Sequence, residues 1–207
     1  MKIGGGNTER LPLNAWVWPE KGGKTVTMSL LIASDLHGSA SQTRLIKDRA
    51  DSLNPDMVIL LGDLLYHGPR NPLTDHYSPA QTVAFLADFG RPVAAIRGNC
   101  DAEVDQMILP FPLADNSWIL IDGHRILAIH GHQLEMNGGP MKIAGNMAVL
   151  SGHTHLPTAE KRGETHFWNP GSASLPKGGY PPTYGLYHDG LFQVMTFDDQ
   201  ILMSDSF

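Results

Sequence analysis

Aspartate, histidine and asparagine residues recur where a short apolar segment gives way to a glycine-containing loop. They are Asp35, His37, Asp63, Asn99, His130, His153 and His155. Carboxylate, imidazole and amide ligands together suit a divalent ion such as Mn²⁺, Fe²⁺, Co²⁺ or Zn²⁺. This number of candidate ligands favours two ions, with an aspartate such as Asp63 bridging them. Paired ions activate water, so the chemistry indicated is hydrolysis.

Each of these ligand candidates lies close behind an apolar segment of the length of a buried strand. The segments cover 28–34, 57–61, 92–96, 125–129 and 147–150. Short segments rich in Val, Ile and Leu and bounded by glycine or proline are typical of buried strands. In α/β sheets, ligands bind where the loops at the carboxyl ends of strands converge. We therefore expect the polar residues to meet at one edge.

Two pairs of candidate ligands are separated by one residue: Asp35 with His37, and His153 with His155. Side chains at i and i+2 of an extended chain point to the same side. Each pair is therefore expected to offer two ligands to one place. A single Asp-x-His or His-x-His block has little weight, since most histidines are ordinary loop or core residues. The prediction depends on five such blocks in series.

Three helices are expected between or after the strands, near 41–53, 79–89 and 138–145. Ser39 or Ser41 can cap the first helix, and Asn54-Pro55 ends it. In the last part of the chain, Asp122-Gly123 and Asp189-Gly190 predict hairpin turns. Strand–helix–strand units followed by hairpins indicate an α/β fold with mixed sheets.

The 207 residues are enough for one domain with a sizeable core. Residues 1–27 contain Gly4-Gly5-Gly6 and show no sustained periodicity, whereas Met28 opens a clear strand. We expect 1–27 to be an N-terminal extension outside the fold, and 28–207 to be a single domain. The alternative is an arm packed on the surface through Trp16 and Trp18.

The composition limits the classes of function. The net charge of -6 disfavours a dedicated groove for long nucleic acid, which needs a basic face. No apolar run approaches the ~20 residues of a membrane span, and a signal-peptide pattern is missing. Cys100 is the single cysteine, so an intrachain disulfide is excluded. A cytoplasmic location is expected. A homo-oligomer is left open, with Trp118 and Phe192 as candidate interface aromatics.

The order of the motifs resembles that of the calcineurin-like metallophosphoesterases. The motifs are Asp35-x-His37, Gly62-Asp63, Gly98-Asn99, His130-Gly131 and Gly152-His153-x-His155. The resemblance extends from about Met28 to about Ser174. Three stretches look like the small bacterial phosphodiesterases of this family in particular: 62–71, 97–101 and 169–172.

The resemblance implies a fold, a metal centre and a reaction. The fold is two mixed β-sheets packed as a sandwich and flanked by helices. The first metal would be held by Asp35, His37, Asp63 and His155, and the second by Asp63, Asn99, His130 and His153. Manganese is usual for this group. The reaction is in-line attack of a metal-bridging hydroxide on a phosphodiester.

One position departs from the pattern of many relatives, which carry histidine directly after the Gly-Asn motif. Cys100 stands there instead, and cysteine is a poorer general acid near neutral pH. Diesters are therefore expected over monoesters, with Cys100 and His67 as candidate catalytic residues and Arg70 as a phosphate-binding residue. The alternatives are a small buried hydrophobe for Cys100 and a loop staple for His67 and Arg70. His132 and the turn at 169–172 are expected to support the site.

The function that these observations favour is a metal-dependent phosphodiesterase acting on a small phosphodiester, without a membrane partner. One alternative keeps the metals but hydrolyses phosphomonoesters or short nucleotides. Another is a binding scaffold of the same fold that has lost catalysis. A metal-storage protein is the third, and the spread of ligands over five strand ends favours a catalytic cleft over it.

Overall fold

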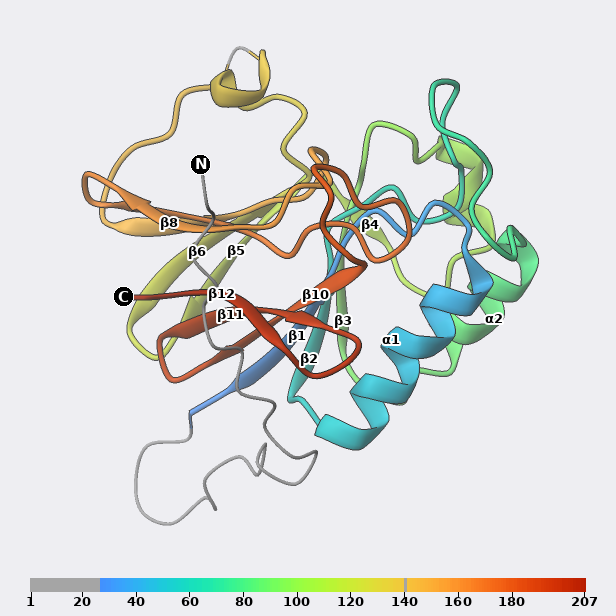
Figure 1. Cartoon of the computed structure of the whole chain (residues 1–207), viewed down its shortest axis with the longest axis horizontal. Coiled ribbons are helices and arrows are strands. Elements are labelled where there is room, and N and C mark those ends of the chain that lie inside the picture. The colour runs from blue at the N-terminus through green and yellow to red at the C-terminus, as the bar shows by residue number, and fades with distance from the viewer. Residues whose placement is uncertain (1–26, 140) are drawn as a thin grey trace, which may run out of the picture.

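Residues 27–139 and 141–207 are described by the structure, which is a computed structural model. The expected N-terminal extension therefore lies outside the described residues, apart from Thr27. Figure 1 shows the described chain as two β-sheets with helices on one side.

The larger sheet contains seven strands in the order β12-β11-β10-β1-β2-β3-β4. Its parallel part consists of β1 (Ser29–Ala33), β2 (Met57–Leu60), β3 (Val93–Ile96) and β4 (Leu113–Ala114). Its antiparallel part consists of β10 (Thr183–His188), β11 (Leu191–Thr196) and β12 (Ile201–Ser206). The predicted turn at Asp189-Gly190 is confirmed, since it joins β10 to β11.

The smaller sheet contains five strands in the order β5-β6-β7-β9-β8. They are β5 (Asn116–Ile121), β6 (His124–Ile129), β7 (Met147–Leu150), β8 (Thr158–Arg162) and β9 (Thr165–Asn169). β6, β7 and β9 run parallel. β5 pairs antiparallel with β6, and β8 pairs antiparallel with β9. The predicted hairpin turn at Asp122-Gly123 joins β5 to β6. Two mixed sheets flanked by helices confirm the expected fold class.

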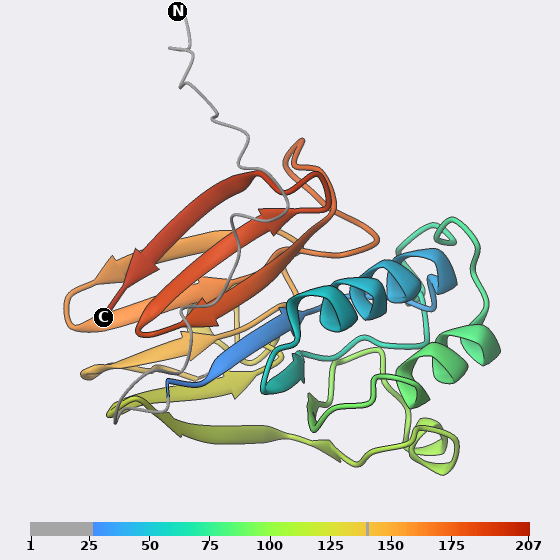
Figure 2. The same ribbon diagram turned by 90° about the horizontal axis from the view of Figure 1, so that it is seen from below.

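Alternating side chains of β1 explain how the layers are held together. Leu30 and Ile32 point into the core between the two sheets, whereas Leu31 and Ala33 pack under the helices. Figure 2 shows this layering, with the sheets stacked and the helices beside the larger one. All four side chains are buried, so burial on both faces accounts for the continuous apolar segment at 28–34.

Two of the three predicted helices are confirmed. α1 (Ala40–Leu53) begins at the N-cap Ser39, whose hydroxyl accepts the Gln42 N–H, and ends at Asn54, which has a left-handed φ of 53°. α2 (Pro79–Ala87) is capped by Ser78. Neither described helix is long and apolar enough to cross a membrane.

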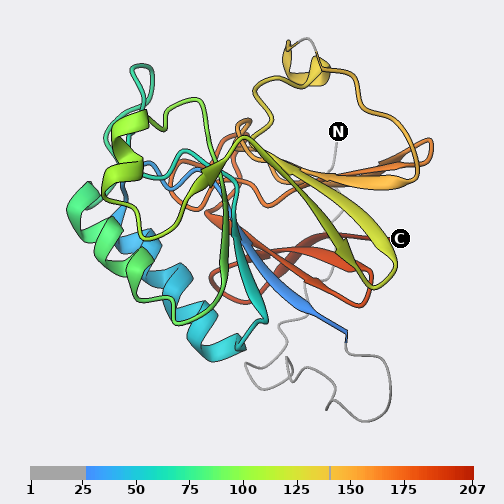
Figure 3. The ribbon, with the colours of Figure 1, turned by 180° about the vertical axis from the view of Figure 1, so that it is seen from behind.

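The helix predicted at 138–145 is wrong. The described residues there form a loop that follows a short 3-10 turn, η3 (Glu135–Asn137), and Figure 3 shows η3 projecting from the smaller sheet. Gly138 and Gly145 have φ values of 86° and 133°, which a right-handed helix excludes. A second 3-10 turn, η2 (Glu103–Met107), lies between β3 and β4.

Only one of the two aromatic residues considered for an interface is exposed. Trp118 is 56% exposed on β5, at the edge of the smaller sheet. Phe192 is fully buried and stacks on Trp168 between the sheets, with ring centroids 5.1 Å apart. The expectation for Phe192 was therefore wrong.

Candidate metal centre

The loops that follow β1, β2, β3, β6 and β7 meet at one end of the two sheets, as the sequence predicts. Backbone hydrogen bonds join them: His37 N–H donates to Asp63 O at 2.8 Å, and Gly152 N–H donates to His130 O at 2.9 Å. The side chains from these loops form groups with the spacing of metal ligands. Residues far apart in the chain are thereby held in one site.

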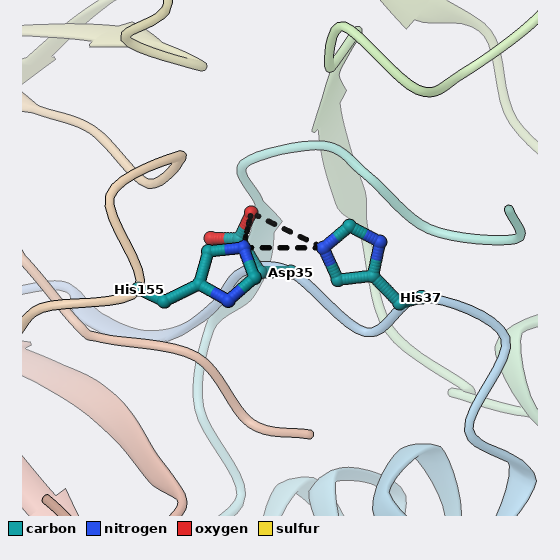
Figure 4. A group of neighbouring side chains, drawn as sticks. All are labelled: Asp35, His37 and His155. Carbon is teal, nitrogen blue, oxygen red and sulfur yellow. Dashed lines mark hydrogen bonds and ion pairs between the residues drawn. The ribbon is translucent and has the colours of Figure 1, made fainter. Parts of the chain in front are cut away.

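Asp35, His37 and His155 form the first cluster (Figure 4). Asp35 Oδ1 lies 3.8 Å from His37 Nε2 and 3.4 Å from His155 Nε2. The two Nε2 atoms are 3.2 Å apart. All three side chains are almost completely shielded from solvent.

The hydrogen bonds of the first cluster test whether a cation fits there. His37 Nδ1 donates to the Tyr66 carbonyl at 2.8 Å, and His155 Nδ1 donates to the Leu175 carbonyl at 2.6 Å. Since a carbonyl only accepts, each neutral ring carries its proton on Nδ1 and presents a bare lone pair at Nε2. Asp35 Oδ1, which faces both lone pairs, has no hydrogen-bond partner among the described residues. Three acceptors that face one another fit a metal ion.

Asp63, Asn99 and His130 form a second cluster beside the first. His130 Nε2 lies 3.0 Å from Asn99 Oδ1 and 3.5 Å from Asp63 Oδ1. His130 Nδ1 donates to the Leu61 carbonyl at 2.6 Å, so its Nε2 is again an acceptor in the neutral ring. The other carboxylate oxygen, Asp63 Oδ2, lies 3.7 Å from His37 Nε2. Asp63 therefore stands between the two clusters.

His153 and His155 do not offer their rings to one place, so this part of the spacing argument was wrong. His155 belongs to the first cluster, whereas the His153 ring lies 5.2 Å from the His130 ring. The backbone is not extended, because φ is 67° at His153 and 61° at His155. Asp35 and His37 also have positive φ, 55° and 46°, yet their side chains do converge. Such strained backbone persists where the surrounding fold imposes it, commonly at functional sites.

The buried charges of the second cluster shift each other's pKa. Burial raises the pKa of Asp63, but the hydrogen bond and positive charge of His130 outweigh it and hold this pKa well below its usual range. Burial lowers the pKa of His130, yet the carboxylates of Asp63 and Asp35 raise it to about 9. Burial and the charge of His130 lower the pKa of His153 to about 4. In the metal-free protein an imidazolium at His130 therefore neutralises part of the acidic charge.

Asp101 positions the centre and was not singled out by the sequence argument. Its buried carboxylate accepts three backbone N–H groups, from Asp63 at 2.8 Å, Leu64 at 2.7 Å and Gly98 at 2.8 Å. It thus ties the loop after β2 to the loop after β3. The available signal was an aspartate two residues after Asn99, inside the same glycine-containing block.

The turn at 169–172 supports the centre, as expected. Asn169 Nδ2 donates to the Gly152 carbonyl at 2.8 Å, and Ser172 Oγ donates to the Asp35 carbonyl at 2.8 Å. Ser34 Oγ donates to Asp35 Oδ2 at 2.7 Å. The His153 N–H donates to the same oxygen at 3.0 Å. The bonds from Ser34 and His153 occupy Asp35 Oδ2 and leave Asp35 Oδ1 for the first cluster.

Cys100 lies at the edge of both clusters. Its N–H donates to Asp63 Oδ1 at 2.8 Å, and its Sγ is within 4.8 Å of ligand atoms of His37 and Asp63. Burial, followed by the charge of Asp63, raises the pKa of the thiol to about 12. In the metal-free protein the thiol therefore stays protonated near neutral pH.

His67 and Arg70 lie on the loop that borders Cys100. Gly68 of this loop abuts the thiol, since a Cβ atom built on Gly68 would lie 2.9 Å from Cys100 Sγ. The His67 ring packs edge-on against Tyr66 and Tyr77, at centroid distances of 4.6 and 5.3 Å. Arg70 is exposed, and its guanidinium forms no ion pair with another described residue. His132 packs 5.6 Å from the His130 ring, beside the second cluster.

The fold and the motifs have counterparts in known proteins. Residues 28–189 match the calcineurin-like phosphoesterase superfamily domain. The chain is 40% identical over 178 residues to phosphodiesterase YfcE of Escherichia coli K12, covering 86% of this chain and 96% of that protein. The YfcE structure superposes with a TM-score of 0.79, covering 86% of this chain and 98% of that one.

A more distant structure shares the fold alone. It is a predicted phosphoesterase from Streptococcus pneumoniae TIGR4 with 21% identity and a TM-score of 0.59, covering 89% of this chain and 99% of that one. The family match at 28–189 spans all seven candidate ligands. The chain therefore belongs to the calcineurin-like phosphoesterases, a family of phosphoric ester hydrolases.

Proposed function

We propose that this protein hydrolyses small phosphodiesters with two divalent metal ions held by the two clusters. The observation that carries the proposal is the position of Asp63. Its two carboxylate oxygens face different histidines, with Oδ2 3.7 Å from His37 Nε2 and Oδ1 3.5 Å from His130 Nε2. A carboxylate that faces both sets of acceptors could serve as a ligand in each of two metal sites. The name of the E. coli relative, a phosphodiesterase, supports the same reaction.

The residues divide into two ligand sets in this proposal. Asp35, His37, Asp63 and His155 would hold one ion, and Asp63, Asn99, His130 and His153 would hold the other. The mixture of nitrogen and oxygen ligands suits Mn²⁺, which we propose as the native metal, and is shared by Zn²⁺, Fe²⁺ and Co²⁺. Bound ions of this kind lower the pKa of water and neutralise charge that develops on phosphate oxygens.

The surrounding side chains orient the ligands and the substrate. The carbonyl partners of Nδ1 fix the ring orientation of His37, His130 and His155. The exposed guanidinium of Arg70, which forms no ion pair with another described residue, can donate two hydrogen bonds to one phosphate group. His67 lies on the same loop, where its imidazole can donate to a phosphate oxygen or to the departing group.

The substrate preference follows from Cys100. A thiol is a poorer general acid near neutral pH than an imidazolium, so it gives little help to a poor leaving group such as an alkoxide. Diesters with good leaving groups should therefore react faster than alkyl monoesters. A scaffold that has lost its ligands is disfavoured, because the seven expected positions all retain ligand types.

Two chromogenic esters test the proposal. Metal-stripped protein is titrated with Mn²⁺, and hydrolysis of bis(p-nitrophenyl) phosphate is compared with that of p-nitrophenyl phosphate. We expect metal-dependent turnover of the diester that is abolished by Asp63→Asn and by Asn99→Ala. Asp48→Asn, at an exposed position of α1, is the matched control and should retain activity. Diester turnover that needs no metal, or that survives Asp63→Asn, would contradict the proposal.

A further inference from the structure

The first cluster joins parts of the chain that are far apart in the sequence, since Asp35 follows β1 and His155 follows β7. Figure 4 shows their side chains approaching each other from different segments. The distance of 3.4 Å between Asp35 Oδ1 and His155 Nε2 therefore depends on what holds these segments together. Hydrogen bonds of Ser172, in the turn before β10, lead to both of them.

Ser172 uses the full hydrogen-bonding capacity of its hydroxyl group within the protein. The side chain is completely buried. Its Oγ donates to the Asp35 carbonyl at 2.8 Å and accepts the N–H groups of Leu175, at 2.9 Å, and Ser174, at 3.2 Å. A hydroxyl group has one proton to donate and two lone pairs, so all three positions are occupied. The direction of the hydroxyl group is thereby fixed.

Leu175 carries the connection from Ser172 to His155. Ser172 Oγ holds the Leu175 N–H, and the Leu175 carbonyl accepts the proton on His155 Nδ1 at 2.6 Å. Because this hydrogen bond fixes the tautomer, the lone pair of His155 Nε2 faces Asp35 Oδ1. The Ser172 hydroxyl thus orients the backbone of Asp35 on one side and, through Leu175, the imidazole of His155 on the other.

The second cluster is oriented by different contacts. His130 Nδ1 donates to the Leu61 carbonyl, and the Leu61 N–H donates to the Ala33 carbonyl at 2.9 Å. The end of the larger sheet therefore holds the His130 ring. Among the described residues, the three hydrogen bonds of the Ser172 hydroxyl lead to the first cluster and not to His130 or Asn99.

We propose that Ser172 is a positioning residue for the first metal site, where it sets how Asp35 and His155 face the same ion. The inference rests on the proposed function for the ion itself. Ser174 offers a matched comparison, because its Oγ donates to the same Asp35 carbonyl at 2.8 Å, whereas the Leu175 N–H is held by Ser172. Removal of the Ser172 hydroxyl loosens both ends of the link, and removal of the Ser174 hydroxyl loosens one.

The first measurement needs no metal. Long-range ¹H–¹⁵N NMR spectra of the full-length, metal-free protein at pH 8 report which nitrogen of each imidazole carries the proton. We expect His155 of the wild type in the form protonated on Nδ1. Ser172→Ala should give a mixture of tautomers, because a loosened Leu175 carbonyl lets Nε2 donate to Asp35 instead. Ser174→Ala should keep the wild-type spectrum, and an unchanged His155 ring in Ser172→Ala would overturn the inference.

The second measurement is isothermal titration of the metal-stripped protein with Mn²⁺. We expect the wild type to bind two ions. In Ser172→Ala the affinity for one ion should fall about tenfold, and the affinity for the other should change by less than about twofold, since substitutions around metal ligands cost about 10- to 100-fold. Ser174→Ala should lower neither affinity by more than about twofold. Equal losses in the two variants would overturn the link to His155.

Failure of the proposed function is recognised separately. Wild-type protein that binds fewer than two Mn²⁺ ions would overturn the two-metal proposal, and the His155 spectra would still support or overturn the orienting role of Ser172. If Ser172→Ala does not fold, Ser172→Cys takes its place in both measurements, because a thiol has a similar volume and forms weak hydrogen bonds.

Discussion

Gly98 lies so close to Asp63 that a Cβ atom built on it would stand 2.0 Å from Asp63 Oδ1 and 2.3 Å from Asp63 N. The backbone conformation does not explain this glycine, because its φ is not among the positive values. Glycine is needed at position 98 because there is no space for a side chain beside Asp63. The loop after β3 must approach the loop after β2 closely enough for Gly98 and Asp63 to share Asp101 as an acceptor. The close approach of the two loops thereby fixes the position of the Asp63 carboxylate between the two clusters.

Gly98→Ala is therefore expected to disable the centre without removing a ligand. The added methyl group must displace Asp63, and a shift of about 1 Å in a reacting group can cost about a hundredfold in rate. The measurements are kcat/KM with bis(p-nitrophenyl) phosphate and the Mn²⁺ content of the purified protein. Gly163→Ala, in the β8–β9 turn, is the control: an added Cβ meets nothing within 4 Å, and the strain of its φ of 62° is confined to a turn away from the metal centre. Wild-type activity of the Gly98 variant would refute the steric argument.

Metal binding is expected to release a proton from His130. The pKa of His130 is raised to about 9 in the metal-free protein, so the ring is protonated at pH 7.5 and must lose a proton to become a ligand. Because proton and metal compete for Nε2, metal affinity should rise with pH and level off above about 9. Each pH unit below that value should weaken affinity by about tenfold.

Isothermal titration of Mn²⁺ in buffers with different ionisation enthalpies measures this proton release directly. When the observed binding enthalpy is plotted against the ionisation enthalpy of the buffer, the slope gives the number of protons released. We expect a slope near one proton for each metal-loaded protein at pH 7.5 and a smaller slope at pH 9.5. His124→Asn, at a histidine that stacks on Phe207 away from the clusters, should leave the slope unchanged. A slope of zero at pH 7.5 would show that His130 is already neutral.

Cys100→His is expected to broaden the substrate range towards monoesters. An imidazolium at this position can protonate a departing oxygen, which a thiol does poorly near neutral pH. Turnover of an alkyl monoester such as glycerol 3-phosphate, relative to that of bis(p-nitrophenyl) phosphate, should rise by about tenfold or more, because only the alkoxide needs a proton donor to leave. Cys100→Ser is the matched variant and should not raise the ratio. If the histidine variant gains no monoesterase activity, Cys100 does not determine the preference for diesters.

Asp205 is expected to contribute to stability without affecting the reaction. Its Oδ2 on β12 accepts hydrogen bonds from His166 at 2.6 Å and from Trp168 at 2.8 Å on β9, and so joins the two sheets. Asp205→Ala leaves two buried donors unpaired, which should cost about 2–3 kcal/mol of unfolding free energy. Urea denaturation measures the loss, with Ser204→Ala, an exposed neighbour, as control. Unchanged stability would mean that water replaces the carboxylate.

Local features of the sequence were sufficient to predict most of the framework. The strands follow from short apolar segments, and α1 follows from Ser39 and Asn54, because caps and turns depend on neighbouring residues. The convergence of the polar loops follows from the rule that parallel strands present their carboxyl ends to one edge. The helix expected at 138–145 failed for a local reason that was visible, namely glycines at both ends of the segment.

The tertiary structure decided which polar residue belongs to which of the two clusters. An extended chain would direct His153 and His155 to one place, but their left-handed backbone, imposed by the surrounding loops, sends the rings to different clusters. The role of Asp101 and the need for glycine at position 98 depend on contacts between loops that follow different strands. Residue types and spacing thus determined which chemistry is available. The distances that place the two carboxylate oxygens of Asp63 in different clusters arise only from tertiary packing, because they join residues that no local rule brings together.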